Sequence, residues 1–257
     1  MWTDPHAPHH DRPAVRCLDR AIGIIKPDVV NCLGDLGEWE PASHWQWKKK
    51  KRPPLDYQLA EIDKDIEAVN LFLDERDAVC AKAGVKTKRM LQGNHDDWID
   101  RVVYENPHIS RTRHKWGRGY LFQDALNLRG RGYKFSPLGE YVKVGKLYLH
   151  HGHHYSGIHH TINHLRQLGR NIMYGHHHDV QHRVVTQLEG PIGGWSIGCL
   201  KCHDHEANEW LGRRKHNWGH AFAVVDFISG GEFRVHVVDI VGGRCSLWGE
   251  LIDGNKA

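Results

Sequence analysis

The 257-residue sequence lacks an uninterrupted apolar run of about 18 residues, the length that a membrane-spanning helix requires. Its first residues, Met1 to Pro13, are polar and rich in histidine, so no secretory signal is visible. Cysteine is scarce and scattered, and without an export signal the six cysteines are expected to be reduced thiols. We therefore expect a cytoplasmic protein that makes no membrane contact.

Repeats and low-complexity linkers are also absent. We expect one domain over residues 1–257, with basic and aromatic insertions near residues 41–55 and 107–131. Disorder is excluded because 10 Trp, 8 Tyr and 6 Phe are spread along the chain. The net charge of +4 is weak evidence for an anionic partner. The 23 histidines exceed what packing requires, and they indicate metal or acid–base chemistry.

Apolar periodicity predicts helices and strands in alternation, followed by strands toward the end of the chain. One helix is expected to begin at Pro13, because proline is favoured in a first turn, and another to end before Gly84. The expected helices cover residues 13–25, 56–83, 98–104 and 158–168. The expected strands cover residues 29–33, 85–91, 141–144, 146–150 and 171–174, and an antiparallel β region is expected from His182 onward that includes residues 221–228 and 232–240. This order predicts an α/β fold with a mixed sheet.

Side chains that can bind metals stand beside glycine where the early strands end. The motifs are Gly34-Asp35, Gly93-Asn94-His95-Asp96, His151-Gly152 and Gly175-His176-His177-His178. The carboxyl ends of strands in an open α/β sheet meet at one crevice, and glycine lets the backbone approach a ligand closely. Asp4 and His6 add a fifth motif, whose spacing places both side chains on one face of an extended chain.

These five motifs, in this order, resemble those of the calcineurin-like metallophosphoesterases. The match covers about two thirds of the chain, from Asp4 to His178. Two motifs of the tail, Gly194-Trp195-Ser196 and Trp218-Gly219-His220, further resemble the phage- and prophage-encoded branch. The resemblance implies a four-layer αββα sandwich with two mixed β-sheets and a dinuclear metal centre at one edge.

The resemblance also implies a role for each motif residue. Asp4, His6, Asp35 and His178 would hold one cation, and Asp35, Asn94, His151 and His176 the other, so that Asp35 bridges. Mixed oxygen and nitrogen ligands suit Mn, which we expect, and also Fe, Zn, Ni or Co. His95 would assist the leaving oxygen, and Glu38 would orient His95. Either His150 or His151 could be the ligand, and His151 matches the motif because it directly precedes Gly152.

A run of aromatic and basic residues is the most suggestive substrate feature. It comprises Trp45, Trp47, Lys48, Lys49, Lys50, Lys51 and Arg52. Tryptophans beside cations can stack bases and hold phosphates, although the run could equally be a solvated loop. Two similar clusters surround Trp116 (Arg111, Arg113, Lys115 and Arg118) and follow Trp210 (Arg213, Arg214 and Lys215). Together the three clusters favour a large polyanion, DNA or RNA, over a small metabolite.

The expected function is therefore hydrolysis of phosphodiester bonds in nucleic acid by a dinuclear metal centre. Two alternatives remain open: a phosphomonoesterase acting on nucleotides or phosphoproteins, and a non-catalytic, metal-containing accessory protein that binds nucleic acid. The sequence does not choose an oligomeric state.

One further cluster is ambiguous. Cys199-Leu200-Lys201-Cys202-His203 matches the C-x-x-C-H pattern of haem attachment, but the chain has no export signal, and we interpret the match as coincidence. Cys199, Cys202, His203 and His205 could instead hold a structural zinc ion. A plain loop that carries reduced thiols is the simpler interpretation.

Overall fold

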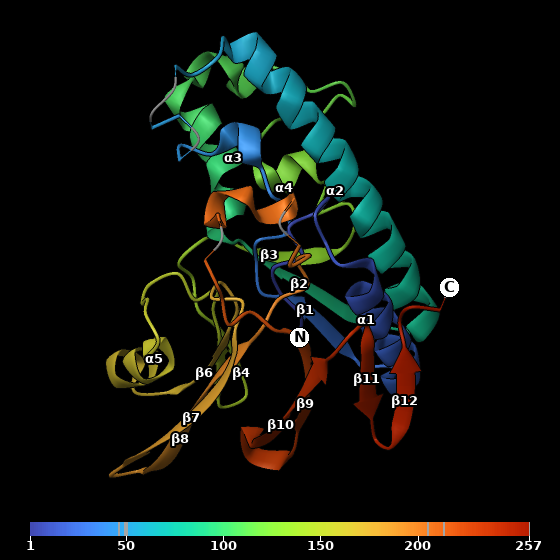
Figure 1. Ribbon diagram of the computed structural model, residues 1–257, viewed down its shortest axis with the longest axis vertical. Coiled ribbons are helices and arrows are strands. Elements are labelled where there is room, and N and C mark those ends of the chain that lie inside the picture. The colour runs from blue at the N-terminus through green and yellow to red at the C-terminus, as the bar shows by residue number, and fades with distance from the viewer. Residues whose placement is uncertain (46, 49–50, 205, 213, 257) are drawn as a thin grey trace.

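Two β-sheets lie face to face, with helices on their outer faces, in the computed structural model of the protein (Figure 1). The structure describes residues 1–45, 47–48, 51–204, 206–212 and 214–256. Its α-helices are α1 (Arg12–Ile25), α2 (Leu55–Ala83), α3 (Asn94–Glu105), α4 (Phe122–Ala125) and α5 (His160–Leu168). The 3₁₀ helices are η1 (Glu40–Ala42), η2 (Pro107–Arg111), η3 (Glu206–Leu211) and η4 (Ser229–Gly231).

The first sheet contains three parallel strands, β1 (Val29–Cys32), β2 (Thr87–Leu91) and β3 (Tyr133–Ser136). Backbone hydrogen bonds of Met1 and Trp2 extend it. The Trp2 nitrogen donates to the Asn31 carbonyl over 3.0 Å, and Met1 exchanges two hydrogen bonds with Ala223. The sheet thus continues, with antiparallel partners, into the hairpin of β9 (His220–Phe227) and β10 (Phe233–Ile240).

The second sheet has the order β4-β5-β6-β8-β7 and combines parallel and antiparallel pairs. Its strands are β4 (Val142–Val144), β5 (Leu147–Leu149), β6 (Asn171–Tyr174), β7 (Val180–Gln187) and β8 (Gly190–Ile197). A separate hairpin, β11 (Arg244–Leu247) and β12 (Glu250–Asp253), packs against α1.

Three apolar clusters define the layers. Ile22 of α1, Ile66 of α2 and Met90 of β2 belong to one cluster, which joins these helices to the first sheet. A second cluster fills the space between the sheets, and its members are Leu33, Leu91, Leu147, Leu149, Met173, Ile197 and Ala223. A third, of Leu165, Ile172 and Tyr174, joins α5 to the second sheet. The expected four-layer αββα sandwich with two mixed sheets is therefore confirmed.

Local sequence explains where the helices begin and end. The Asp11 carboxylate accepts a hydrogen bond from the Ala14 nitrogen over 2.7 Å and caps α1, with Pro13 in the first turn. Gly84 ends α2 with a φ of 74°. The expected start of α3 near Trp98 was wrong, because α3 already begins at Asn94. Its first turn consists of polar residues of the third motif, which apolar periodicity does not detect.

Two strand features escaped the sequence analysis. β3 was not expected, and it is a four-residue strand with one buried side chain, Tyr133. The β11–β12 hairpin lies in the region expected to be antiparallel β, but its bounds were not predicted, because each strand has only four residues. No disulfide joins the cysteines, which are all free thiols. Within the described residues, no helix combines the length and the apolar character that crossing a bilayer requires.

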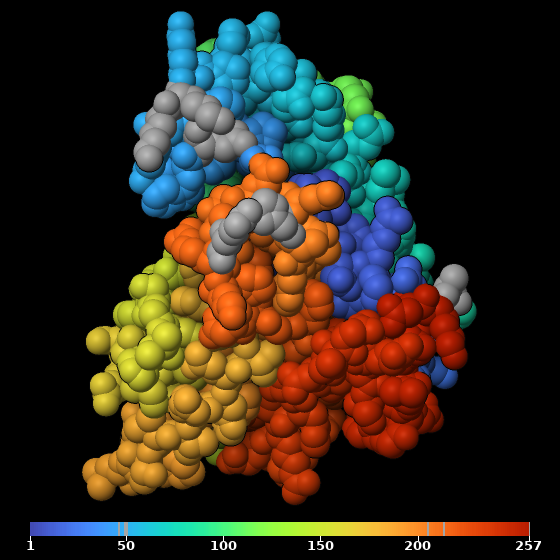
Figure 2. Space-filling view, in the orientation of Figure 1, coloured from blue at the N-terminus to red at the C-terminus, as the bar shows by residue number. Residues whose placement is uncertain are grey.

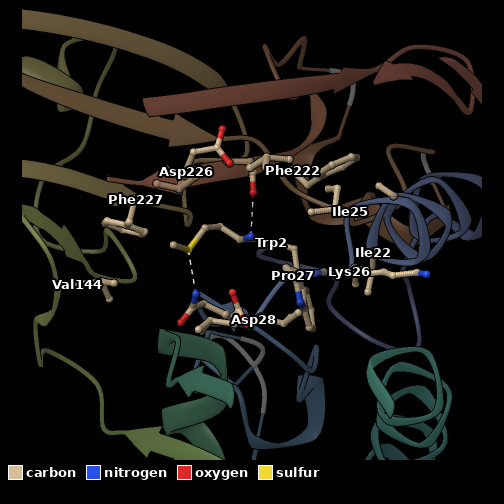
Figure 3. Close-up of a pocket in the computed structure, with 18 of the residues that line it drawn as sticks. Trp2, Ile22, Ile25, Lys26, Pro27, Asp28, Val144, Phe222, Asp226 and Phe227 are labelled. Atoms are coloured by element: carbon tan, nitrogen blue, oxygen red, sulfur yellow. Dashed lines mark hydrogen bonds between the residues drawn. The ribbon is translucent and has the colours of Figure 1, made fainter. Parts of the chain in front are cut away.

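A cavity of about 660 Å³ opens at the start of β1, between the end of α1 and strand β9 (Figure 3). Ile22 and Ile25 of α1 face Phe222 of β9 across it, and the Met1–Ala223 hydrogen bond crosses its wall. No histidine lines this cavity among the described residues. Because the expected metal ligands follow the other end of β1, this cavity is separate from them.

Asp65, on α2, is half-buried, and its carboxylate oxygen Oδ2 is buried without a hydrogen-bond partner. Burial, together with the charges of Glu38, Glu40 and Glu61, raises its pKa to about 7. The folded protein therefore binds a proton that the unfolded chain releases near pH 4, so stability falls as pH rises from about 4 to 7.

Replacing this carboxylate with a neutral amide, Asp65→Asn, is expected to raise stability by roughly 2 kcal/mol at pH 8 and by little at pH 4.5. Thermal melts of both proteins at the two pH values measure this. A gain of equal size at both values would show that the ionised carboxylate is not the cause.

Candidate metal centre

The loops after β1, β2, β5 and β6 meet the segment that follows Trp2 at the carboxyl edge of the sheets. Each loop contributes at least one of the seven expected ligands. Asp4, His6, Asp35 and His151 are almost fully buried, with at most 1% of their surface exposed. The structure thus gathers polar side chains that are separated by up to 174 residues into one interior site.

Four donor atoms surround one position. The Nε2 atoms of His6 and His178 lie 3.1 Å apart, and His178 Nε2 lies 3.4 Å from Asp4 Oδ1. Asp35 Oδ2 lies 3.7 Å from His6 Nε2. Spacings of this size are what several ligands on one ion would show, since each bond to a metal is about 2.0–2.2 Å long.

A second position adjoins the first. His151 Nε2 lies 2.9 Å from Asn94 Oδ1 and 3.3 Å from Asp35 Oδ2. The His176 ring lies 5.1 Å from the His151 ring, and its buried Nδ1 has no hydrogen-bond partner. The same oxygen of Asp35 thus lies near ligands of both positions, as expected for a carboxylate oxygen that bridges two cations.

The backbone at the centre is in an unusual conformation. Five of the expected ligands have a positive φ: Asp4 (50°), His6 (48°), Asp35 (48°), His176 (67°) and His178 (61°). Such a conformation costs about 1–3 kcal/mol for a residue other than glycine, and it persists where function requires it. The fold therefore accepts local strain to direct these side chains inward.

Two glycines allow the loops to pack this closely. A Cβ atom on Gly93 would overlap the backbone nitrogen and the carboxylate of Asp35, and a Cβ atom on Gly175 would overlap the carboxylate of Asp4. A larger residue at either position would displace a ligand.

Charge at the centre suits cations. Burial alone would raise the pKa of the Asp35 carboxyl, but the imidazoles of His151 and His95 outweigh burial and hold the pKa well below its usual range. Burial and the nearby Lys201 lower the pKa of His6 to about 4, so its ring stays neutral. Burial opposes protonation of His151 too, but the charge of Asp35 outweighs it and raises its pKa to about 9.

Buried carboxylates, imidazole nitrogens and one amide oxygen are the donor set that divalent transition metals prefer, and His151 would release its proton on binding a cation. The buried Nδ1 atom of His176 has no hydrogen-bond partner, which is unfavourable unless a cation lies beside it. The residues present therefore fit a pair of divalent cations.

His95 lies at the edge of the centre. Its Nδ1 is 3.0 Å from the backbone carbonyl of Glu38, and its ring lies 3.9 Å from the Trp98 ring. The Glu38 carboxylate is farther away, with Oε1 3.9 Å from His95 Nδ1. Glu38 thus contacts His95 mainly through its backbone carbonyl.

The Glu38 carboxylate instead contacts His6 and Lys201. Its Oε2 lies 3.0 Å from His6 Nδ1 and accepts a hydrogen bond from Lys201 Nζ over 2.6 Å. Lys201 is 1% exposed and was missed, because no sequence pattern connects it with a residue 163 positions earlier. Asp96 was also given no role, and its carboxylate accepts hydrogen bonds from Leu36, Gly37, Trp39 and Gly93.

A cavity of about 630 Å³ opens onto the centre. Four tryptophans line it, of which Trp45 and Trp210 are 59% and 63% exposed. Trp218 contacts the His178 ring at 4.5 Å, and Trp98 contacts His95. Trp45 comes from the segment before α2, and Trp210 and Trp218 come from the segment after β8. The two segments are neighbours on the face in Figure 2, coloured blue and orange.

The structure places part of the expected substrate run at this cavity. Trp45 lines it, and Lys48 Nζ lies 3.5 Å from the centre of the Trp45 ring. Trp47 is half-buried, Lys51 is exposed, and Arg52 pairs with Glu105 over 2.8 Å. Lys49 and Lys50 lie outside the described residues.

The second basic cluster lies elsewhere, because none of its residues lines the cavity; Lys115 covers Trp116 and pairs with Glu67.

The cysteine cluster differs from the zinc set that the sequence left as an alternative. Cys202 is not part of the group formed by Cys199 and His203, and its thiol donates a hydrogen bond to the Asp204 carboxylate over 2.8 Å. Cys199 meets His203 and also His220, which the sequence analysis had placed only in a tail motif. His205 lies outside the described residues.

Comparisons with known proteins identify what this chain is similar to. A family model described as calcineurin-like phosphoesterase matches residues 2–185. The Gene 54 proteins of Mycobacterium phage L5 and Mycobacterium phage D29 are 24% and 22% identical to this chain, over 97% of its length and 96% of theirs. The crystal structure of Vps29 from Chaetomium thermophilum aligns with 98% of this chain and 94% of its own at 10% identity, with a TM-score of 0.44.

Loss of the shared carboxylate tests the bridging role. Asp35→Asn is expected to lower the affinity for both cations together, by 10-fold or more, because the amide carries no charge and donates hydrogen bonds at one of its two positions. Metal content after dialysis, measured by plasma mass spectrometry, reports the loss. Asp97→Asn is the control, since this carboxylate pairs with Arg101 outside the centre. Full metal retention by Asp35→Asn would contradict bridging.

Proposed function

The chain belongs to the calcineurin-like phosphoesterase family, and we propose that it hydrolyses phosphodiester bonds in nucleic acid. Membership supports metal-dependent phosphoester hydrolysis as the reaction and implies two divalent cations. The mycobacteriophage relatives support the phage-type branch. We further propose that the protein is phage- or prophage-encoded, acts in the cytoplasm and uses manganese.

The expected ligands would hold one cation with Asp4, His6, Asp35 and His178 and the other with Asp35, Asn94, His151 and His176. When bound, the two cations would lower the pKa of the attacking water and stabilise charge on the phosphoryl oxygens. Glu38 and Lys201 keep His6 in place, because the Glu38 carboxylate contacts both.

His95 is suited to transfer a proton. With its Nδ1–H donated to the Glu38 carbonyl, Nε2 is the atom that can exchange a proton with the leaving oxygen. The Trp98 ring packs against the imidazole, with the two ring centres 3.9 Å apart and the ring planes tilted by 33°. Both contacts hold His95 in one orientation before substrate enters.

The observation that carries the proposed substrate is the tryptophan lining of the cavity. Trp45 and Trp210 expose large aromatic faces beside the metal centre, and such faces bind nucleobases by stacking. Lys48 lies against Trp45, and Arg214 and Lys215 follow Trp210 closely in the chain. Stacking surfaces with adjacent cations match a chain of bases joined by phosphates.

Charge compensation favours a diester over a monoester. A phosphomonoester dianion would benefit from a free cationic side chain beside the metals. Lys201 is the buried lysine that lines the cavity, but its ammonium group is paired with the Glu38 carboxylate. The centre therefore suits the single negative charge of a diester.

Paired substrates test the reaction. With Mn²⁺, we expect hydrolysis of bis-p-nitrophenyl phosphate to be at least 10-fold faster, in kcat/KM, than hydrolysis of p-nitrophenyl phosphate, and we expect single-stranded DNA to be cleaved. The reverse ratio would identify a monoesterase, and DNA binding without turnover across a panel of metals would identify an accessory protein.

The stacking surface is tested by Trp210→Ala. Loss of one stacked base costs about 1–3 kcal/mol, so KM for a single-stranded oligonucleotide should rise about 5- to 150-fold. Hydrolysis of methyl p-nitrophenyl phosphate, which is too small to span the cavity, should be nearly unchanged. Trp248→Ala is the matched control, since Trp248 is 59% exposed in the turn between β11 and β12. Equal effects of both variants would remove Trp210 from the substrate site.

The basic run makes a separate prediction. Replacing Lys48 to Lys51 with alanine should leave hydrolysis of small substrates intact and should weaken the salt dependence of DNA binding. The slope of log K against log salt changes by about 0.7 for each single-strand phosphate that the protein no longer neutralises. An unchanged slope would indicate that this run is a solvated loop that does not neutralise DNA phosphates.

A further inference from the structure

A second set of metal-capable side chains lies where the segment after β8 returns to the sheet. Cys199 follows β8, His203 lies four residues later, and His220 begins β9. One potential ligand atom from each residue lies within 4.8 Å of the other two. The Cys199 sulfur and His203 Nε2 are 3.3 Å apart, and the His203 and His220 rings are 3.9 Å apart.

The surrounding hydrogen bonds leave suitable lone pairs free. His220 Nε2 lies 2.7 Å from the Lys201 carbonyl, which can only accept, so this nitrogen carries the proton and Nδ1 keeps its lone pair. A histidine that donates one N–H to a backbone carbonyl while its other nitrogen binds a metal is the usual arrangement in metal sites. The Cys199 thiol is fully buried, so its sulfur does not face solvent.

The backbone holds the two ends of this set together. The Cys199 nitrogen donates to the Gly219 carbonyl over 3.0 Å, and Cys199 and His220 form a parallel bridge. Their side chains are therefore placed by the sheet, and the flanking segment needs only to supply His203. A site with two preformed ligands loses less conformational freedom when it binds an ion.

This set is distinct from the dinuclear centre. It shares none of the seven expected ligands, and it contains a sulfur, which the centre lacks. The Trp218 ring contacts both, at 4.5 Å from the His178 ring and 5.7 Å from the His203 ring. The two sites are thus neighbours on either side of one aromatic side chain.

We propose that Cys199, His203 and His220 bind a third metal ion, a zinc, which holds the segment between β8 and β9 in place. A thiolate and two imidazoles suit zinc and fit poorly with magnesium or calcium, and water can complete the tetrahedron. Binding replaces the thiol proton, which passes to solvent, with a sulfur–zinc bond.

The position of this ion gives it a function. The segment between Cys199 and His220 carries Lys201, Trp210 and Trp218, which all line the cavity above the dinuclear centre. Among the described residues between Cys199 and His220, the 3₁₀ helix η3 is the one helix. An ion that joins the first residues of this segment to its last would hold Trp210 and Trp218 at the cavity without taking part in hydrolysis.

The full-length protein, loaded with zinc and freed of loosely bound metal, provides the test. X-ray absorption should show a zinc–sulfur distance of about 2.3 Å besides zinc–nitrogen and zinc–oxygen distances near 2.0–2.1 Å. Metal analysis should give three zinc ions per chain. Replacing zinc with cobalt should add a near-ultraviolet band from thiolate-to-cobalt charge transfer, which the dinuclear centre has no sulfur to produce.

Variants assign the sulfur. Cys199→Ser and His220→Gln should each lower the content to two ions and abolish the charge-transfer band, whereas Cys202→Ser, three residues away, should keep both. Absence of a zinc–sulfur distance in the wild-type protein would overturn the proposal. This measurement needs no variant, so the proposal can be refuted even if Cys199→Ser misfolds. A band that survives in Cys199→Ser, or disappears in Cys202→Ser, would also overturn it.

The two proposals fail separately. Asp35→Asn should lose the dinuclear cations and retain the cobalt band, because Asp35 is not part of the sulfur site. A third ion in a protein without hydrolytic activity would leave the zinc site standing and refute the proposed reaction.

Discussion

The Asp35 carboxylate is the constraint on which the rest of the structure depends. It is buried, charged and approached by imidazoles from two directions, so the loops after β1 and β5 and the segment after Trp2 must converge on it. An uncompensated buried charge is costly, and cations between the loops would compensate it. The left-handed conformation of five expected ligands and the glycines that pack against Asp35 and Asp4 follow from this convergence.

The cavity beside the metal centre is lined largely by segments outside the two sheets. Its tryptophans come from the segment before α2, from α3 and from the segment between β8 and β9. A scaffold shared across a family can thus keep its metal centre while the surrounding segments change the substrate. The proposed zinc site belongs to these surrounding segments, since it would stabilise a wall of the cavity and would not contact the reacting groups.

The fold was largely readable from the sequence because its longer elements follow simple periodicities. α1, α2, α5 and the β9–β10 hairpin were expected close to their observed bounds. The first turn of α3 was missed, since Asn94, His95 and Asp96 are polar and the turn is specified by hydrogen bonds of Asp96. Short strands such as β3 were missed because four residues carry too little pattern.

The sequence by itself determined the family resemblance and the seven expected ligands, because each motif is local and follows a strand whose end has a known place in such a sheet. Only the tertiary structure decided which distant residues meet. Lys201 reaches Glu38, His220 joins Cys199 in place of Cys202, and Trp210 lies near the same cavity as Trp45. The physical reason is that these contacts depend on how loops pack across the sheet edge, and no spacing along the chain encodes that packing.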